Sequence, residues 1–287
     1  MTCFFRGRTV LLRIMFDLVK TIGGVEYFQS GLLRKMGVPH AFSTRIGGVS
    51  SGPFSSLNLG NPQGAAQQDS ATNIRMNQQR LAATIESADA PVAWVRQVHG
   101  NQTAVLLAGE LAQQPDMLLR RFSGQTAADA IVCNAAGVLL SMRIADCAPI
   151  LLATLDGTMV AAIHAGWRGA VANAAGQALS EMGKLGAKPA HIVAAIGPAI
   201  GPEAFEVGHE VAAEFGRAGL GEAVKTGNGG KPHIDLSQAL EIQLRAAGLK
   251  EIDTCELCTV ANKQWFFSHR RENGITGRMA AMIRRPI

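Results

Sequence analysis

Short apolar runs, separated by glycines and other turn-forming residues, dominate the middle of this 287-residue chain. A run of roughly four to eight apolar residues is typical of a buried β-strand, whereas a helix shows a longer apolar periodicity. We therefore expect strands at residues 130–133, 138–144, 150–155 and 159–165, with others at 91–99, 191–196 and 265–268.

Longer segments, with apolar residues three or four positions apart, predict helices between these strands. The first begins near residue 70, where Asp69 or Ser70 can cap a helix whose Ile74, Leu81 and Ile85 share one face. Three more helices are expected, at residues 168–185, 210–215 and 236–247.

No linker long enough to separate two domains interrupts this alternation of strands and helices, and residues 108–125, which fit neither pattern, are interpreted as a surface excursion. We expect one mixed α/β domain over residues 26–287, preceded by a poorly ordered N-terminal extension over residues 1–25. Arg13 interrupts the apolar run of this extension, so it does not match a secretory signal peptide.

The Asp156-Gly157 pair lies between two apolar runs and predicts a two-residue hairpin turn. With this turn, the numbers of paired residues sum to 313, and His164 lies opposite Pro149. Cys147 projects from the same face as position 149, so Cys147 and His164 become diagonal neighbours about 7–8 Å apart between Cα atoms. A thiol and an imidazole can therefore meet at the open end of the hairpin.

Such a pair has two chemical uses, which the spacing alone leaves open. An imidazole beside a thiol lowers its pKa and makes a nucleophile. The two groups can also bind a metal ion with His99 as third ligand, leaving one tetrahedral position open. The ordinary alternative is a core thiol beside a hydrogen-bonded histidine. Asp146, next to Cys147, is expected to point to the opposite face.

The segment from Ala162 to Gly169 runs from a strand into a helix through a glycine-containing turn. Free N–H groups at a helix start attract anions, and Arg168 adds a guanidinium that can bind phosphate or carboxylate. Tight packing of the turn explains the glycines equally well.

Composition excludes several classes of protein. Hydrophobic residues make up 47% and charged residues 17%, which is incompatible with a disordered chain. Aromatic residues make up only 5% and there is no basic tract, so we expect no nucleic-acid partner. No uninterrupted apolar stretch of about 18 residues predicts a membrane span. Five cysteines, an odd number, do not form a disulfide scaffold and indicate a cytoplasmic protein.

Several motifs together resemble the laccase-domain family, once described as multicopper polyphenol oxidases and now as purine nucleoside phosphorylases with adenosine deaminase activity. The three signature segments are Gln97-Val98-His99-Gly100, Ala145-Asp146-Cys147-Ala148-Pro149 and His164-Ala165-Gly166-Trp167-Arg168-Gly169. Further matches are Phe42-Ser43-Thr44-Arg45, Ser56-Leu57-Asn58-Leu59-Gly60, Ile196-Gly197-Pro198, Phe267-Ser268-His269-Arg270-Arg271 and Thr276-Gly277-Arg278. The resemblance covers roughly residues 26–284.

The resemblance implies a layered fold, α-β-β-α like that of cysteine hydrolases, with mixed sheets packed together and helices outside. It implies zinc bound by His99, Cys147 and His164, with copper as the alternative metal. It also implies phosphorolysis of adenosine, inosine, guanosine and S-methyl-5'-thioadenosine, and hydrolytic deamination of adenosine. Purine nucleosides and inorganic phosphate are then the partners of a monomer or small homo-oligomer.

From this resemblance we expect catalytic roles for Cys147, His164, His99 and Asp146. We expect substrate contacts from residues of the matching motifs, namely Arg45, Arg168, Asn58, Arg270 and Arg278. Two alternatives stay open. One is a copper-dependent polyphenol oxidase, although the seven histidines form no H-x-H pair. The other is a cysteine hydrolase that edits peptidoglycan precursors and uses Cys147 as nucleophile.

Overall fold

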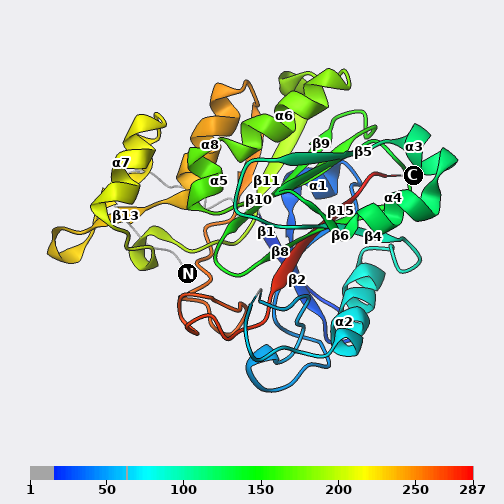
Figure 1. Ribbon diagram of the computed structural model, residues 1–287, viewed down its shortest axis with the longest axis horizontal. Coiled ribbons are helices and arrows are strands. Elements are labelled where there is room, and N and C mark those ends of the chain that lie inside the picture. The colour runs from blue at the N-terminus through cyan, green and yellow to red at the C-terminus, as the bar shows by residue number, and fades with distance from the viewer. Residues whose placement is uncertain (1–15, 63, 287) are drawn as a thin grey trace.

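Two β-sheets packed face to face form the centre of the computed structural model, which describes residues 16–62 and 64–286 (Figure 1). The first sheet has seven strands, in the order β1 (Phe16–Lys20), β2 (Glu26–Ser30), β3 (His40–Ser43), β15 (Met279–Arg284), β8 (Leu139–Ile144), β4 (Val92–Arg96) and β6 (Ser123–Ala127). The second has six, in the order β14 (Glu251–Thr254), β11 (Ile192–Ile196), β9 (Ala148–Thr154), β10 (Val160–Ala165), β7 (Ala130–Cys133) and β5 (Thr103–Leu106). Both sheets mix parallel and antiparallel neighbours.

Helices cover the outer faces of both sheets. The described residues form helices α1 (Gly31–Lys35), α2 (Ala71–Thr84), α3 (Ala108–Gln113), α4 (Pro115–Arg121), α5 (Trp167–Val171), α6 (Ala174–Lys184), α7 (His209–Arg217) and α8 (Leu236–Ala246). A small ribbon of β12 (Val224–Thr226) and β13 (Pro232–Ile234) lies beside α7 (Figure 1).

Three groups of buried apolar side chains hold these layers together. One fills the space between the second sheet and α6, α7 and α8, another lies between the two sheets, and the third lies between the first sheet and α2. The order of layers is therefore α-β-β-α, and the expected layered α/β fold is confirmed.

Strand β10 shows how the alternation of side chains serves both sides of its sheet. Ala161 and Ile163 pack toward the helices, whereas Val160 and Ala162 pack between the sheets. Because successive side chains in a strand point to opposite faces, His164 shares the face of Val160 and Ala162. His164 therefore faces the layer between the two sheets, near the end of the strand.

Most of the expected elements are present, but residues 108–125, interpreted as a surface excursion, contain helices α3 and α4. Three other expectations differ from the structure. Residues 16–25, assigned above to a poorly ordered extension, contribute strand β1, which pairs along its whole length with β2; residues 1–15 lie outside the described residues. The strand expected at residues 265–268 is wrong, because this segment is a loop. The helix expected over residues 168–185 is two helices, since Asn173 adopts a left-handed φ of 57° and caps α6.

None of the helices in the described parts of the chain has the length and apolar character needed to cross a bilayer.

Candidate active site and metal centre

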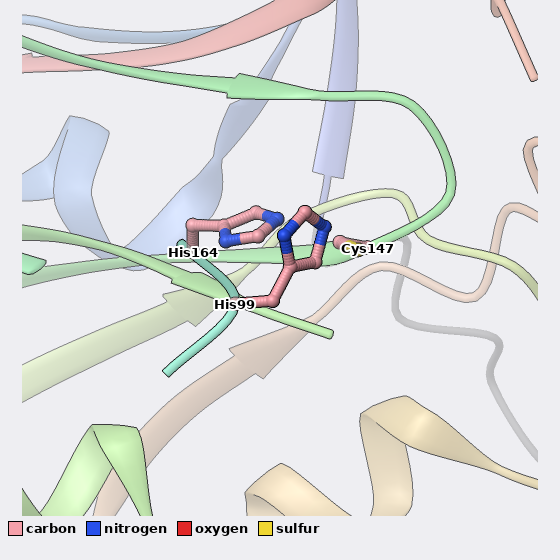
Figure 2. A group of neighbouring side chains, drawn as sticks. All are labelled: His99, Cys147 and His164. Carbon is pink, nitrogen blue, oxygen red and sulfur yellow. The ribbon is translucent and has the colours of Figure 1, made fainter. Parts of the chain in front are cut away.

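Cys147, His164 and His99 meet at one end of the two sheets (Figure 2). The hairpin register is as the sequence predicted, with His164 opposite Pro149, and Cys147 directly precedes β9. His99 comes from the loop after β4. One donor atom from each of the three residues lies within 4.8 Å of the others, and the two imidazole rings meet edge to face with centroids 4.9 Å apart.

The three side chains differ in their exposure to solvent. His164 is buried, Cys147 is partly buried and His99 is exposed. A ligand entering from solvent therefore reaches His99 first, and His164 forms the floor of the site.

Asp129, just before β7, is a site residue that the sequence analysis did not identify. Its Oδ1 lies 2.9 Å from Nδ1 of His164, and both residues are buried. Since a carboxylate accepts, Nδ1 of His164 carries a proton, and Nε2 is the nitrogen that faces the thiol of Cys147 and that could bind a metal ion once deprotonated.

The same carboxylate fixes the loop that carries His99. It accepts hydrogen bonds from the backbone N–H groups of Val98, His99 and Gly100, at 3.2, 3.0 and 2.7 Å. His99 has a left-handed φ of 59°, which is uncommon for a residue with a side chain. Three hydrogen bonds to one buried carboxylate stabilise this backbone, so Asp129 positions both histidines.

Charge is redistributed within the trio. Burial would raise the pKa of the Cys147 thiol, but the neighbouring imidazoles of His164 and His99 outweigh burial and lower that pKa. Burial would lower the pKa of His164, but Cys147 and Asp129 outweigh burial and raise it. The pair therefore favours thiolate and imidazolium over thiol and neutral imidazole at neutral pH.

Gly166 has a steric role beside the thiol. A Cβ atom at this position would lie 2.9 Å from Sγ of Cys147 and 3.5 Å from Cδ2 of His99. Its φ of −81° is open to any residue, so space rather than backbone freedom requires glycine here. The His164–Gly169 turn thus makes room for the thiol, and helix α5, which follows it, has only five residues.

The donor set fits a zinc ion. One thiolate and two imidazoles are the borderline-soft ligands that zinc prefers, and three protein ligands leave a fourth position open for water or substrate. The hydrogen bond from His164 to Asp129 is the kind of support that metal-binding histidines have. The same donors also bind copper, so the chemistry of the set does not identify the metal.

The trio opens into a cavity of about 650 Å³. Its described walls carry a strong excess of positive charge, with a single carboxylate, that of Asp146. The arginines that line it are Arg96, Arg143, Arg168, Arg270 and Arg278.

Asp146 uses both carboxylate oxygens to hold distant segments. Oδ1 accepts from the hydroxyl of Thr259, and Oδ2 accepts from the hydroxyl of Ser268 and the backbone N–H of Arg270. Its own backbone has a left-handed φ of 84°. Asp146 therefore ties the 259–270 segment to the link between β8 and β9.

The expected substrate-binding residues separate into two groups. Arg168, Arg270 and Arg278 line the cavity. Arg45 and Asn58 are not among its lining residues.

Arg45 has other partners outside the cavity. Its guanidinium donates to the Ser55 carbonyl, pairs with Glu272 and stacks over the Phe267 ring at 4.5 Å.

Asn58 is fully buried beneath the cavity. Its Oδ1 accepts hydrogen bonds from the backbone N–H groups of Gly60 and Arg278. Asn58 therefore supports Arg278, a residue of the cavity wall, without lining the cavity itself.

The three expected substrate contacts that line the cavity differ in their exposure and their partners. Arg168 is exposed and stacks on Trp167 at 4.3 Å. Arg270 is exposed and donates to the carbonyls of Ala204 and Glu206. Arg278 is partly buried; burial lowers its pKa, and the nearby thiol of Cys147 opposes that change. Of the expected substrate contacts, Arg278 is therefore the one whose charge interacts with the Cys147 thiolate.

Comparison with known proteins gives matches over most of the chain. Residues 39–286 match the model of a family described as multi-copper polyphenol oxidoreductase laccase. The chain is 40% identical over 251 residues to a purine nucleoside phosphorylase of Deinococcus radiodurans, covering 88% of this chain and 90% of that protein. It is 37% identical over 248 residues to purine nucleoside phosphorylase YfiH of Escherichia coli, covering 86% and 93%.

Solved structures give the same result. The crystal structure of YlmD from Geobacillus stearothermophilus matches with a TM-score of 0.81 and 30% identity, covering 94% of this chain and 99% of that one. The Neisseria meningitidis protein NMB0706 matches with a TM-score of 0.73 and 29% identity, covering 95% and 100%.

Proposed function

This chain belongs to the multi-copper polyphenol oxidoreductase laccase family, and from that membership and the chemistry of its cavity we propose that it is a purine nucleoside phosphorylase. The observation that carries the proposal is the cavity itself, in which a cationic wall faces a Cys–His–His trio. Relatives that bear the name purine nucleoside phosphorylase match nearly the full length of the chain. The substrates are then a purine nucleoside and inorganic phosphate, in the cytoplasm.

Phosphorolysis breaks the bond between C1' of the ribose and N9 of the purine, while a phosphate oxygen forms a bond to C1'. The electron pair of the broken bond leaves with the purine, which takes up a proton. A site for this reaction must hold a phosphate anion next to a sugar that gains positive charge. The arginine-lined wall of the cavity supplies the attraction for phosphate.

We assign the chain's own residues as follows. Arg278 contacts the phosphate, because it is partly buried in the cavity wall and close enough to Cys147 for the two charges to interact. Arg168, exposed at the mouth, draws the anion in. Arg270 has its guanidinium committed to backbone carbonyls and shapes the wall.

Two histidines are candidates for the leaving purine. His99 and His269 are the exposed histidines of the cavity, and either can donate to the purine ring. Asp146 positions the 259–270 segment and transfers no proton, since its oxygens already accept from three donors.

We further propose that adenosine deamination takes place in the same cavity. A zinc ion held by His99, Cys147 and His164 would supply a Lewis acid that activates water. In that case Asp129 keeps the proton of His164 on Nδ1 and its free Nε2 toward the ion.

The cysteine hydrolase remains as a second function because of one specific contact. Cys147, His164 and Asp129 form the thiol–imidazole–carboxylate series of a nucleophilic triad. In that function the Cys147 thiolate would attack the substrate carbonyl, and the His164 imidazolium would give its proton to the amine that leaves. A multicopper phenol oxidase needs several metal sites. It has no comparable support, because the described residues offer one cluster of three potential ligands, the trio.

Incubation of the purified protein with adenosine, with and without phosphate, tests the proposal. Phosphate-dependent release of adenine indicates phosphorolysis, and phosphate-independent formation of inosine indicates deamination. Failure to form adenine, inosine or hypoxanthine, in protein whose zinc content is confirmed, would reject the function.

A further inference from the structure

Arg143 of β8 lies in the cavity wall in an unusual setting. Its guanidinium stacks on the Trp94 ring of β4, with Cζ 3.7 Å from the ring centroid. The Trp94 ring is itself fixed by Gly124, where a Cβ atom would lie 2.2 Å from the indole. A stacked guanidinium loses little further freedom when it binds a ligand, so Arg143 is preorganised.

The charge of Arg143 has no counter-charge within the described residues. Its Nε is buried without a hydrogen-bond partner, and no carboxylate forms an ion pair with it. Burial lowers its pKa to about 10, and no acidic neighbour opposes that change. Because an unpaired charge is costly to remove from water, this position is suited to an anionic ligand.

Arg278 lies on the same face of the seven-stranded sheet as Arg143. In the register of β8 and β15, Arg143 lies opposite Ala280, so Arg278 is its diagonal neighbour. Both arginines line the cavity. NH1 of Arg278 donates to the carbonyls of Thr276 and Gly277, while its other nitrogens have no partner in the described chain.

Asn58 holds these two arginines in relation to each other. Its Oδ1 accepts from the N–H of Arg278 and from the N–H of Gly60. Gly60 lies against the stem of Arg143, where a Cβ atom would be 2.5 Å from Cδ. Asn58 and Gly60 therefore link the backbone of Arg278 to the stem of Arg143.

We propose that Arg143 and Arg278, with Trp94 as the platform beneath Arg143, form a subsite for a tetrahedral oxyanion. This deepens the proposed function, since it identifies where inorganic phosphate binds and adds Arg143 and Trp94 to the substrate-binding residues. Two rigid guanidinium groups can bind several oxygens of one phosphate at the same time. The same chemistry would hold the phosphate group of a nucleotide.

Calorimetric titration of the zinc-loaded protein with inorganic phosphate tests the subsite, at low and at high salt. Arg143→Gln should weaken binding roughly 10- to 100-fold, as expected for loss of charge-assisted hydrogen bonds. Arg143→Lys keeps the charge but not the planar guanidinium, so it should lose less phosphate affinity. It replaces Arg143→Gln as the test variant if the glutamine protein does not fold. Trp94→Leu should weaken binding because it releases the guanidinium.

Arg168→Gln is the matched control, because Arg168 lines the same cavity but is exposed. Its effect should be a few-fold and should disappear at high salt, whereas the effect of Arg143→Gln should persist. Unchanged phosphate affinity in a folded Arg143→Gln protein would overturn the subsite. Loss of binding on chelation alone, with Arg143→Gln unaltered, would place phosphate on the metal and would also overturn it.

Two competitors identify the source of the oxyanion. Phosphate that binds together with adenosine, and more tightly than adenosine 5'-monophosphate does, indicates free phosphate; adenosine 5'-monophosphate that displaces phosphate and binds much more tightly than phosphate indicates a nucleotide; both results support the subsite. If phosphate binding depends on Arg143 in a protein that cleaves no nucleoside, the proposed function fails and the subsite stands.

Discussion

Nδ1 of His164 donates a hydrogen bond of 2.9 Å to Oδ1 of Asp129, a residue 35 positions earlier in the chain. This contact sets the tautomer of the imidazole and directs Nε2 into the site. Because the same carboxylate accepts from the loop that carries His99, one buried side chain controls the positions of two of the three donors.

Asp129→Asn is expected to weaken zinc binding by roughly 10- to 100-fold and to lower the free energy of unfolding by about 1–3 kcal/mol. The side-chain amide that this substitution introduces would place its own N–H group against N–H donors, from His164 or from the loop that carries His99, that bind a carboxylate oxygen in the wild type. Metal analysis and urea denaturation measure the two effects. Asp69→Asn is the control, because Asp69 also accepts several hydrogen bonds but lies outside the cavity. Equal zinc affinity in both variants would contradict the positioning role.

Single substitution of His99, Cys147 or His164 by Ala should remove most of the bound zinc and most of the activity. The fold should survive, since each residue lies at a strand end or in a loop. Zinc content after purification without added metal, together with circular dichroism, checks this. His191→Ala, at an exposed position, should keep its zinc. Full metal retention in His99→Ala would remove that residue from the site.

Alkylation of Cys147 should be slow in zinc-loaded protein and fast after chelation, because bound metal shields the thiolate. In the metal-free protein the pKa of this thiol is lowered to about 6, so the rate should fall as the pH drops below that value. Mass spectrometry of labelled peptides measures the rate, and Cys147→Ser corrects for the other cysteines. Rapid alkylation with zinc bound, together with a covalent adduct to substrate, would favour the cysteine hydrolase.

Arg168→Ala should raise the apparent KM for phosphate a few-fold and leave deamination nearly unchanged, since an exposed charge acts mainly by attraction that salt screens. Arg45→Ala should behave differently. Its guanidinium binds Glu272 and Phe267, so we expect a loss of stability of about 1–3 kcal/mol with near-normal KM. Steady-state kinetics and thermal melting separate the two. An unchanged melting temperature with a raised KM in Arg45→Ala would return Arg45 to the substrate site.

His40 should make the protein sensitive to mild acid. Its Nε2 accepts from the Ser30 N–H, and burial lowers its pKa to about 4. Between pH 6.5 and about 4 the unfolded chain takes up a proton that the folded protein cannot, so stability falls as the pH drops, by up to about 3 kcal/mol.

The variant His40→Gln tests this pH dependence. It should be less stable at pH 7.5 but should lose less on acidification. Urea midpoints at pH 7.5 and pH 5 measure this, with the exposed His191→Gln as control. Identical pH dependence in wild type and His40→Gln would exclude His40 as the cause.

Local patterns predicted local structure well. The Asp156-Gly157 turn correctly fixes the register of β9 and β10, because only the turn between them decides it. The last strand was missed for a physical reason. All six residues of Met279–Arg284 are buried, so no alternation marks them, and the segment is rich in methionine and alanine, which favour helices. Phe266 and Phe267 imitate a strand, but they fill the core from a loop.

The site could be predicted only where its contacts are close in sequence. Cys147 and His164 follow from a hairpin, whereas Asp129 pairs with His164 through β7 and β10, which two other strands separate in the chain. Pairing of Ala130 with Ile163 places Asp129 opposite His164, so the signal exists only once that long-range register is known. Arg45 lies outside the cavity lining, since a cationic residue beside glycines also suits a loop that binds its own chain.

Strand β15 lies between β3 and β8, in the interior of the seven-stranded sheet, although it comes from the end of the described sequence (Figure 1). During synthesis on the ribosome, β3 and β8 are therefore complete while the strand that joins them has still to be made. Until residues 279–284 emerge, both strands present open edges that can pair with other chains. Arg278, which directly precedes β15, cannot take its place until then, so a nascent chain contains His99, Cys147 and His164 long before the cationic wall of the cavity is complete.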